Sequence, residues 1–193
     1  MTFLTDFADE AVILPVVLAV GMALFAQGWR RGAAAWVLVM VATFAAVLAL
    51  KLLFLACSTS LGAGDIRTPS GHVAAATVVA GGLAALLLRR RSVALPLAGL
   101  VAIVIGVSRL ALGLHSLAEV VIGAGVGLAG AWALLVLAGR PPEGLGVRRI
   151  LVIVAVVAVL FHGLHLPAEA HIRSTAWRFA HLLAVCQSDE VRL

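Results

Sequence analysis

The chain has 193 residues, of which 63% are hydrophobic and 12% are charged, and its mean hydropathy is +1.16. This composition excludes a soluble globular domain, because a chain of this length cannot hide so much apolar surface from water. The net charge of +5 comes from short arginine clusters between apolar runs, not from a basic surface interleaved with aromatic residues. We therefore expect no nucleic-acid partner.

Six apolar runs approach or reach the length of a helix that crosses a bilayer. They cover residues 11–27, 33–56, 69–88, 93–112, 117–138 and 150–166. The pattern predicts an all-α polytopic transmembrane bundle of about six helices, and the length predicts one domain over residues 1–193. The first run follows an acidic segment without a positive n-region, so we expect a retained helix and not a cleaved signal peptide.

The arginines predict the orientation of the bundle. They cluster at residues 30–31, 89–91 and 140–149, between the apolar runs. Such clusters are typical of cytoplasmic loops. The loops at 57–68 and 113–116 and both termini would then face the opposite side, and the acidic N-terminus agrees with this.

The tail over residues 167–193 has two interpretations. It is an amphipathic helix on the membrane surface or a poorly ordered tail. Cys57 and Cys186 would both lie on the outer, oxidising side, either joined in a disulfide or as two unpaired thiols.

Several residues with metal-binding side chains lie near the end of the last run: His162, His165, Glu169 and His171. Their spacing straddles Leu166-Pro167, which we expect to end that helix, so the four side chains would not share one face. The sequence therefore favours polar anchoring at the interface, and we expect neither a metal site nor a cofactor.

Ionisable residues gather at the predicted outer ends of three helices. They are Lys51, Arg67, His72, Arg109, His115 and Glu119. Such groups are expensive in a membrane, so each is a candidate functional residue. The excess of cations suits a phosphate, whose charge is spread over several oxygens.

The segment from Thr68 to His72 predicts a helix start, with Thr68 as the cap and Pro69 in the first turn. The free N–H groups of that turn would form an anion site. Gly71 would allow close approach and the Ser70 hydroxyl would donate. His72 would exchange a proton with the bound anion.

His115 and Glu119 are four residues apart and would share a helix face. A carboxylate beside an imidazole fixes its tautomer and raises its nucleophilicity. Ser116 to Glu119 also has the pattern of a capping box, in which Glu119 closes the helix start. The two roles are compatible.

Two motifs together, Pro69-Ser70-Gly71-His72 and Ser108-Arg109-x5-His115-x3-Glu119, resemble those of the type 2 phosphatidic acid phosphatase (PAP2) family. This superfamily of all-helical bundles includes lipid phosphatases and the vanadium haloperoxidases. The resemblance covers residues 35–140. It implies a metal-independent membrane phosphatase.

The resemblance also implies residue roles. His115 would be the nucleophile that forms a phosphohistidine. His72 would protonate the leaving oxygen and then activate water. Arg109, Ser70 and Gly71 would hold the phosphoryl oxygens.

This sequence departs from the family pattern in two places. The first family motif places an arginine seven residues after a lysine, but residue 58 is Ser. Lys51 matches the lysine, and Arg67 either replaces the missing arginine or is an interfacial charge. Glu119 stands where the family usually has Asp.

The expected substrate is a phosphorylated lipid: undecaprenyl diphosphate, phosphatidic acid, phosphatidylglycerophosphate or lipid A. By the arginine pattern, the site would face the periplasm or exterior of a bacterial inner membrane. Two alternatives remain, a lipid phosphotransferase with the same motifs and a catalytically inactive relative that binds or transports lipid.

Overall fold

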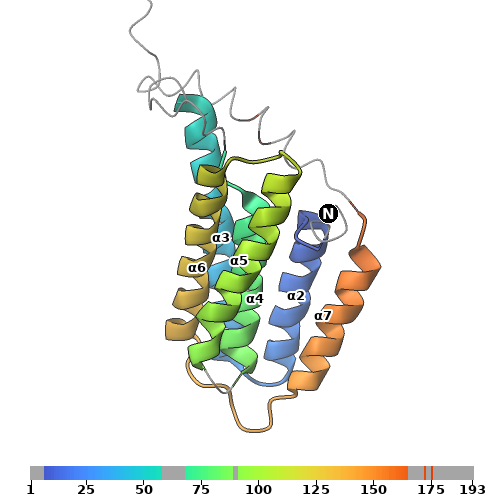
Figure 1. Cartoon of the computed structure of the whole chain (residues 1–193). Coiled ribbons are helices and arrows are strands. Elements are labelled where there is room, and N and C mark those ends of the chain that lie inside the picture. Colours follow the sequence, from blue (N-terminus) through green and yellow to red (C-terminus); the bar gives the residue numbers. More distant parts are fainter. Residues whose placement is uncertain (1–6, 58–67, 89–90, 165–171, 173–174, 176–193) are drawn as a thin grey trace, which may run out of the picture.

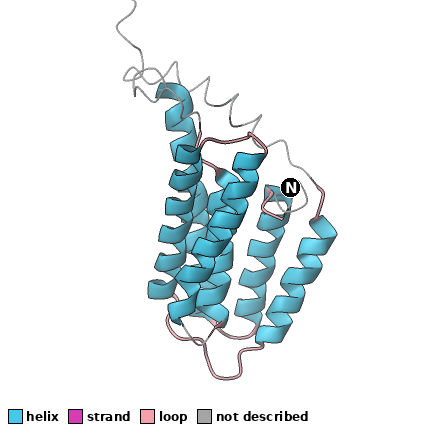
Figure 2. Ribbon diagram, viewed as in Figure 1, coloured by secondary structure: helices cyan, strands magenta, loops and turns pink. Residues whose placement is uncertain are grey.

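The computed structural model describes residues 7–57, 68–88, 91–164, 172 and 175 of the chain. These residues form six α-helices and one 3₁₀ turn, and no strand lies among them (Figures 1 and 2). In chain order the elements are α2 (Glu10–Ala26), α3 (Arg30–Cys57), α4 (Gly71–Leu87), η1 (Arg91–Val93), α5 (Ala94–Ala111), α6 (Leu117–Leu137) and α7 (Val147–Phe161). The predicted all-helical bundle is confirmed.

The helices match the six predicted spans to within about three residues at each end, except at the end of the last span. The last span was expected to reach residue 166, and that prediction is wrong, because α7 ends at Phe161. His162 leaves the helical conformation with ψ 135°, and Gly163 has φ +79°. A glycine in the left-handed region just beyond a helix is a common stop, which the apolar run alone does not reveal.

Helix α4 lies at the centre of the bundle and packs most extensively against α6 and α5 (Figure 1). The contact with α6 is close because glycines face α4. A Cβ on Gly127 would lie 2.7 Å from the carbonyl oxygen of Ala74, and one on Gly130 would lie 2.7 Å from Val78 Cγ2. Small residues let helix backbones approach in this way in membrane bundles.

Helices α2 and α3 are joined by one buried polar contact. Trp36 is fully buried, and its indole N–H donates to the carbonyl oxygen of Val17 at 2.8 Å. A buried indole N–H needs such a partner, so the bond fixes the two helices side by side. Helix α7 packs on the other side of α2.

The surface of the bundle is that of a membrane protein. Three helices, α3, α5 and α6, are long and apolar enough to cross a membrane, and α2 and α4 are shorter apolar helices. Large apolar side chains are exposed on α2, α3, α5, α6 and α7, including Leu18, Leu38, Ile103, Val121 and Val159. A continuous apolar exterior of this kind is stable against hydrocarbon and not against water.

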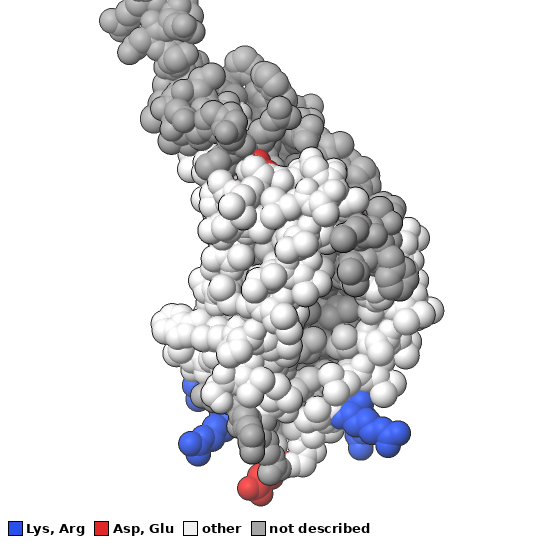
Figure 3. Space-filling model, in the orientation of Figure 1, with Lys and Arg blue, Asp and Glu red and all other residues white. Residues whose placement is uncertain are grey.

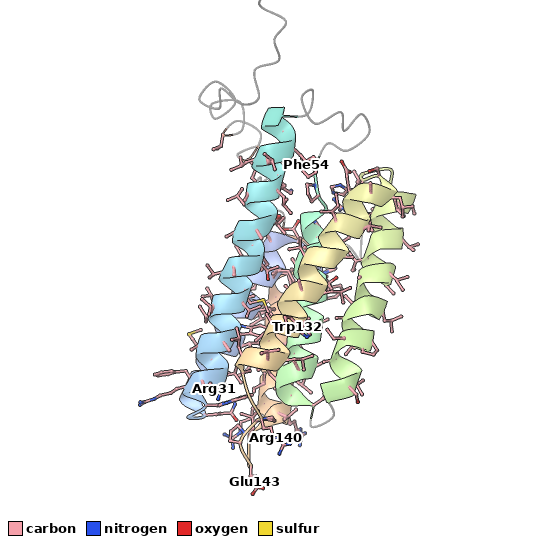
Figure 4. All side chains as sticks on the ribbon, turned by 90° about the vertical axis from the view of Figure 1, so that its left-hand side faces the viewer. Arg31, Phe54, Trp132, Arg140 and Glu143 are labelled. Atoms are coloured by element: carbon pink, nitrogen blue, oxygen red, sulfur yellow. The ribbon has the colours of Figure 1, made fainter. Side chains whose placement is uncertain are left out.

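Exposed arginines gather at one end of the bundle (Figure 3). They are Arg30, Arg31, Arg140, Arg148 and Arg149. Figure 4 shows Arg31 and Arg140 at the end opposite Phe54. The Arg31 Nε–H also donates to the Leu137 carbonyl oxygen at 2.9 Å, which holds the start of α3 against the end of α6.

We predict that the arginine end is cytoplasmic and that the loop before α6 faces the other side. Single cysteines at two exposed positions test this, Leu114→Cys in that loop and Glu143→Cys at the arginine end. The background would be Cys57→Ser and Cys186→Ser. In intact cells an impermeant thiol reagent should label position 114 and leave position 143 unlabelled until the membrane is opened. The reverse pattern would contradict the orientation.

Candidate active site

The starts of α4 and α6 meet at the end of the bundle away from the arginines (Figures 1 and 4). The backbone N–H of Ser70, just before α4, donates to the carbonyl oxygen of Glu119 at 3.0 Å. A Cβ on Gly123 would lie 2.5 Å from the Ser70 carbonyl oxygen, so only glycine fits there. The absent side chain lets α6 lie directly against the chain that enters α4.

The buried carboxylate of Glu119 organises this junction. Its side chain accepts three hydrogen bonds, from the Thr68 N–H at 2.8 Å, the Ser116 N–H at 3.0 Å and the ring of His115 at 2.8 Å. The Ser116 hydroxyl accepts in turn from the Glu119 N–H at 3.4 Å, which completes the predicted capping box. Glu119 therefore caps α6 and holds an imidazole at the same time.

His115 lies just before α6 with its Nδ1 against Glu119 Oε2. Burial lowers the pKa of His115 below its ordinary value, while the hydrogen bond and negative charge of Glu119 raise it and the charges of Arg109 and Lys51 lower it. The lowered pKa favours the neutral imidazole at pH 7. Because Nδ1 then donates to the carboxylate, the lone pair is left on Nε2, as a nucleophile requires.

Groups suited to an anion lie around the start of α4. Lys51 is buried, and its Nζ lies 3.6 Å from the point where a Cβ on Gly71 would be. The Ser70 hydroxyl is fully buried and has no hydrogen-bond partner among the described residues. The N–H groups of the first turn of α4 have no partner within the helix. The start of α4 therefore combines a cation with several hydrogen-bond donors.

The predicted cap of α4 is wrong. Ser70, and not Thr68, occupies the N-cap position, and α4 begins at Gly71, so Pro69 lies outside the first turn. The reason is tertiary: the N–H groups of Thr68 and Ser70 both bond to Glu119. These bonds hold the segment extended, so α4 begins at Gly71, two residues later than the sequence predicts.

His72 is the second residue of α4, and a carboxylate that the sequence did not suggest lies beside it. Asp9 Oδ2 is 3.9 Å from His72 Nε2. Asp9, Glu10 and His72 also offer one atom each of the kind that binds metals, all within 4.8 Å of one another. A carboxylate next to imidazole is equally typical of a proton-transfer pair, and we assign no ion to it.

Arg109 lies in the last turn of α5, and its charge acts on both His72 and His115. The structure thus brings together seven of the eight predicted site residues. The eighth, Arg67, lies outside the described residues, as do Cys186, His165, Glu169, His171 and most of the predicted tail helix. Those predictions stay untested.

The family model described as PAP2 superfamily matches residues 53–141 of the chain. The match covers a little under half of the chain, and over that segment the chain is similar to the PAP2 superfamily. Comparisons with the curated proteins and with the solved structures gave no match. The match supports a phosphoric ester hydrolase in general.

The PAP2 segment carries only part of the site. It contains His72, Arg109, His115 and Glu119, on α4, α5 and the start of α6. Lys51 comes from α3 and Asp9 from the turn before α2, both ahead of the matched residues. Lys51 could be predicted because it is a charged residue within an apolar run. Nothing in the sequence connects residues 9 and 72.

We predict that Glu119→Gln destabilises the fold. In this variant an NH₂ group replaces one acceptor oxygen and faces N–H donors. Each buried donor left without an acceptor costs about 1–3 kcal/mol of stability. A lower midpoint of thermal unfolding in detergent would report this. The control, Glu143→Gln at an exposed site, should change stability by no more than ~0.5 kcal/mol. Equal midpoints for both variants would contradict the central position of the Glu119 carboxylate.

Proposed function

We propose that the protein hydrolyses a phosphate or diphosphate group of a membrane lipid, through a phosphohistidine at His115, on the non-cytoplasmic face of the membrane. The observation that carries this proposal is the contact between His115 Nδ1 and Glu119 at 2.8 Å, near the charges of Arg109 and Lys51. It gives an oriented imidazole whose Nε2 is free to attack, next to groups that attract a phosphate. The PAP2 match over residues 53–141 supports the same reaction class.

In the first step of the proposed reaction, His115 Nε2 forms a bond to phosphorus as the bond from phosphorus to the lipid oxygen breaks. His72, in its imidazolium form, gives a proton to the departing oxygen. Water then attacks phosphorus and the P–N bond breaks, while the now neutral His72 takes a proton from that water. The products are inorganic phosphate and the lipid alcohol, or inorganic phosphate and a lipid monophosphate when the substrate is a diphosphate and the bridging oxygen is the one that departs.

The cations would act on the transferred group. Lys51 and Arg109 carry the positive charge, while the Ser70 hydroxyl and the Gly71 N–H supply directed donors. Donors fixed in advance toward the oxygens where charge develops stabilise a transition state without reorganisation. The buried Ser70 Oγ, with no hydrogen-bond partner among the described residues, supports a ligand at this position.

A groove of about 260 Å³ between α2, α3 and α4 supports the proposal that the substrate carries a hydrocarbon chain. Its walls are apolar, with Ile13 and Leu14 from α2 and Phe44, Val47 and Leu48 from α3. Lys51 and Gly71 line the same groove. A phosphate held at the start of α4 would therefore have its chain beside apolar walls, which suits an amphiphile better than a soluble phosphate ester.

The distribution of charge along the bundle supports a site on the outer face of the membrane. Among the residues that the structure describes, the exposed arginines lie at the end opposite the candidate site (Figures 3 and 4). Positive residues at the ends of membrane helices favour the cytoplasm. The substrate would then come from the outer leaflet, which in a bacterial inner membrane is the periplasmic one.

We predict that His115→Ala abolishes phosphate release from a panel of phosphatidic acid, phosphatidylglycerophosphate, undecaprenyl diphosphate and lipid A. The variant removes the attacking nitrogen, so no residual P–N chemistry is expected. Leu114→Ala, the exposed neighbour, is the control and should keep wild-type rates. Acid-labile, base-stable phosphate trapped on His115 would support the covalent step. Near wild-type hydrolysis by His115→Ala would contradict the assignment.

The same assay separates the two alternatives. A lipid phosphotransferase would pass the phosphoryl group from His115 to a lipid hydroxyl instead of water, so a phosphorylated acceptor would form in mixed micelles. An inactive relative would bind the lipid and release no phosphate from any member of the panel.

We predict that the groove makes hydrolysis depend on chain length. Each methylene buried in it contributes up to about 0.8 kcal/mol, so kcat/KM should rise from butyl to dodecyl phosphate. Leu48→Trp narrows the groove and should lower kcat/KM for dodecyl phosphate roughly 10-fold, the equivalent of about two methylenes, while butyl phosphate is unaffected. Leu100→Trp, on the exposed face of α5, should change neither. Equal effects of the two tryptophans would contradict a chain in this groove.

A further inference from the structure

We infer that Asp9, from the turn before α2, is a positioning residue that holds the proton-bearing form of His72 in place for catalysis. This inference rests on the proposed function. The geometry points to it because the Asp9 carboxylate lies in ion-pair range of the His72 ring, at 3.9 Å. Asp9 lies well outside the matched residues 53–141.

A helix cap fixes the position of Asp9. It is the N-cap residue of α2, and its Oδ1 accepts from the Ala11 N–H at 2.9 Å. This bond occupies one oxygen and turns the other, Oδ2, toward His72 Nε2. Asp9 is only 8% exposed, so water screens the charge weakly.

Packing holds the two chain segments together. Ala8 and Val73, the neighbours of Asp9 and His72, belong to one buried cluster with Ile105 and Val120. The carboxylate and the imidazole therefore cannot separate without opening this cluster. The separation of 3.9 Å is too long for a direct hydrogen bond, so the interaction is Coulombic or passes through a water molecule.

Several groups that can carry positive charge surround His72, and a carboxylate beside the ring offsets their effect. Lys51 on α3, Arg109 on α5 and His115 before α6 all act on the His72 ring. Each of these, when positive, opposes a further positive charge on that ring. Asp9 opposes them, and Glu10 lies within 4.8 Å of the same group of ligand atoms. Of the two carboxylates, Asp9 is the better candidate, because the helix cap orients its Oδ2 toward His72.

In the proposed reaction this carboxylate acts at two moments. It stabilises the imidazolium before its proton passes to the departing lipid oxygen. It does so again after neutral His72 has taken a proton from the attacking water. Asp9 touches no reacting atom and gains no proton itself, so its effect passes entirely through His72.

The test compares leaving groups in purified full-length protein. Asp9→Asn keeps an N-cap side chain but removes the charge. With dodecyl phosphate, whose alkoxide needs a proton to leave, kcat/KM should fall ~10–100-fold, within the range of general acid catalysis. With 4-nitrophenyl phosphate, whose leaving group needs no proton, it should fall less than about 3-fold. The value of kcat/KM reports only the steps up to the departure of the leaving group. Slow hydrolysis of the phosphohistidine therefore does not hide the difference between the two substrates.

A second arm uses the coupling between the two residues. In a His72→Ala background, adding Asp9→Asn should change kcat/KM by less than about 2-fold, because the residues act as one unit. Asp9→Ser, which also caps a helix, should behave as Asp9→Asn does. Unfolding midpoints in detergent accompany every variant.

Three outcomes would overturn the inference. The first is an equal loss with both substrates and a lowered unfolding midpoint, which would reduce Asp9 to a helix cap. The second is wild-type kcat/KM for Asp9→Asn with dodecyl phosphate, and the third is full additivity with His72→Ala. Failure of the proposed function looks different, because the wild-type protein itself would release no phosphate, and the role of Asp9 in catalysis would fall with it.

Discussion

The hydrogen bonds to the Glu119 carboxylate fix the relation between the two helix starts that form the site. Its oxygens accept from His115 and Ser116 on one side and from Thr68 on the other. In apolar surroundings a buried carboxylate is stable only with such donors, and the donors need an acceptor equally. None of the three groups can therefore move alone. The position of the His115 ring relative to α4 follows from one side chain.

Close packing supplies the second half of this constraint. Gly123 brings α6 against the Ser70 carbonyl, and Gly127 brings it against the carbonyl of Ala74 one turn further along. The carboxylate sets how the two starts are joined, while the glycines set how near they lie. A larger side chain at position 123 would push α6 away and stretch the bonds to Glu119. The chemistry of the site and the packing of the membrane bundle thus depend on the same contact.

The sequence predicted the helices and most of the site because their signals are local. A long apolar run, a charge within it such as Lys51, and the four-residue step from His115 to Glu119 can all be read without a fold. The cap of α4 was predicted wrongly because a tertiary bond from Thr68 to Glu119 overrides the local preference. Asp9 was missed for the same reason, since its contact with His72 exists only once Ala8 packs against Val73.

Two residues that precede the matched segment, Lys51 and Asp9, contribute opposite charges to the candidate site. Lys51 on α3 adds a cation beside Gly71, where the N–H groups of α4 also attract an anion. Asp9 adds an anion, but at the N-terminus of α2, where the Ala11 N–H and the helix dipole stabilise it. The helix terminus stabilises this negative charge only in part, so the carboxylate still acts on the His72 ring from the side of α2. In the proposed reaction, a phosphate at the start of α4 and the carboxylate beside His72 would each be stabilised by a different helix terminus.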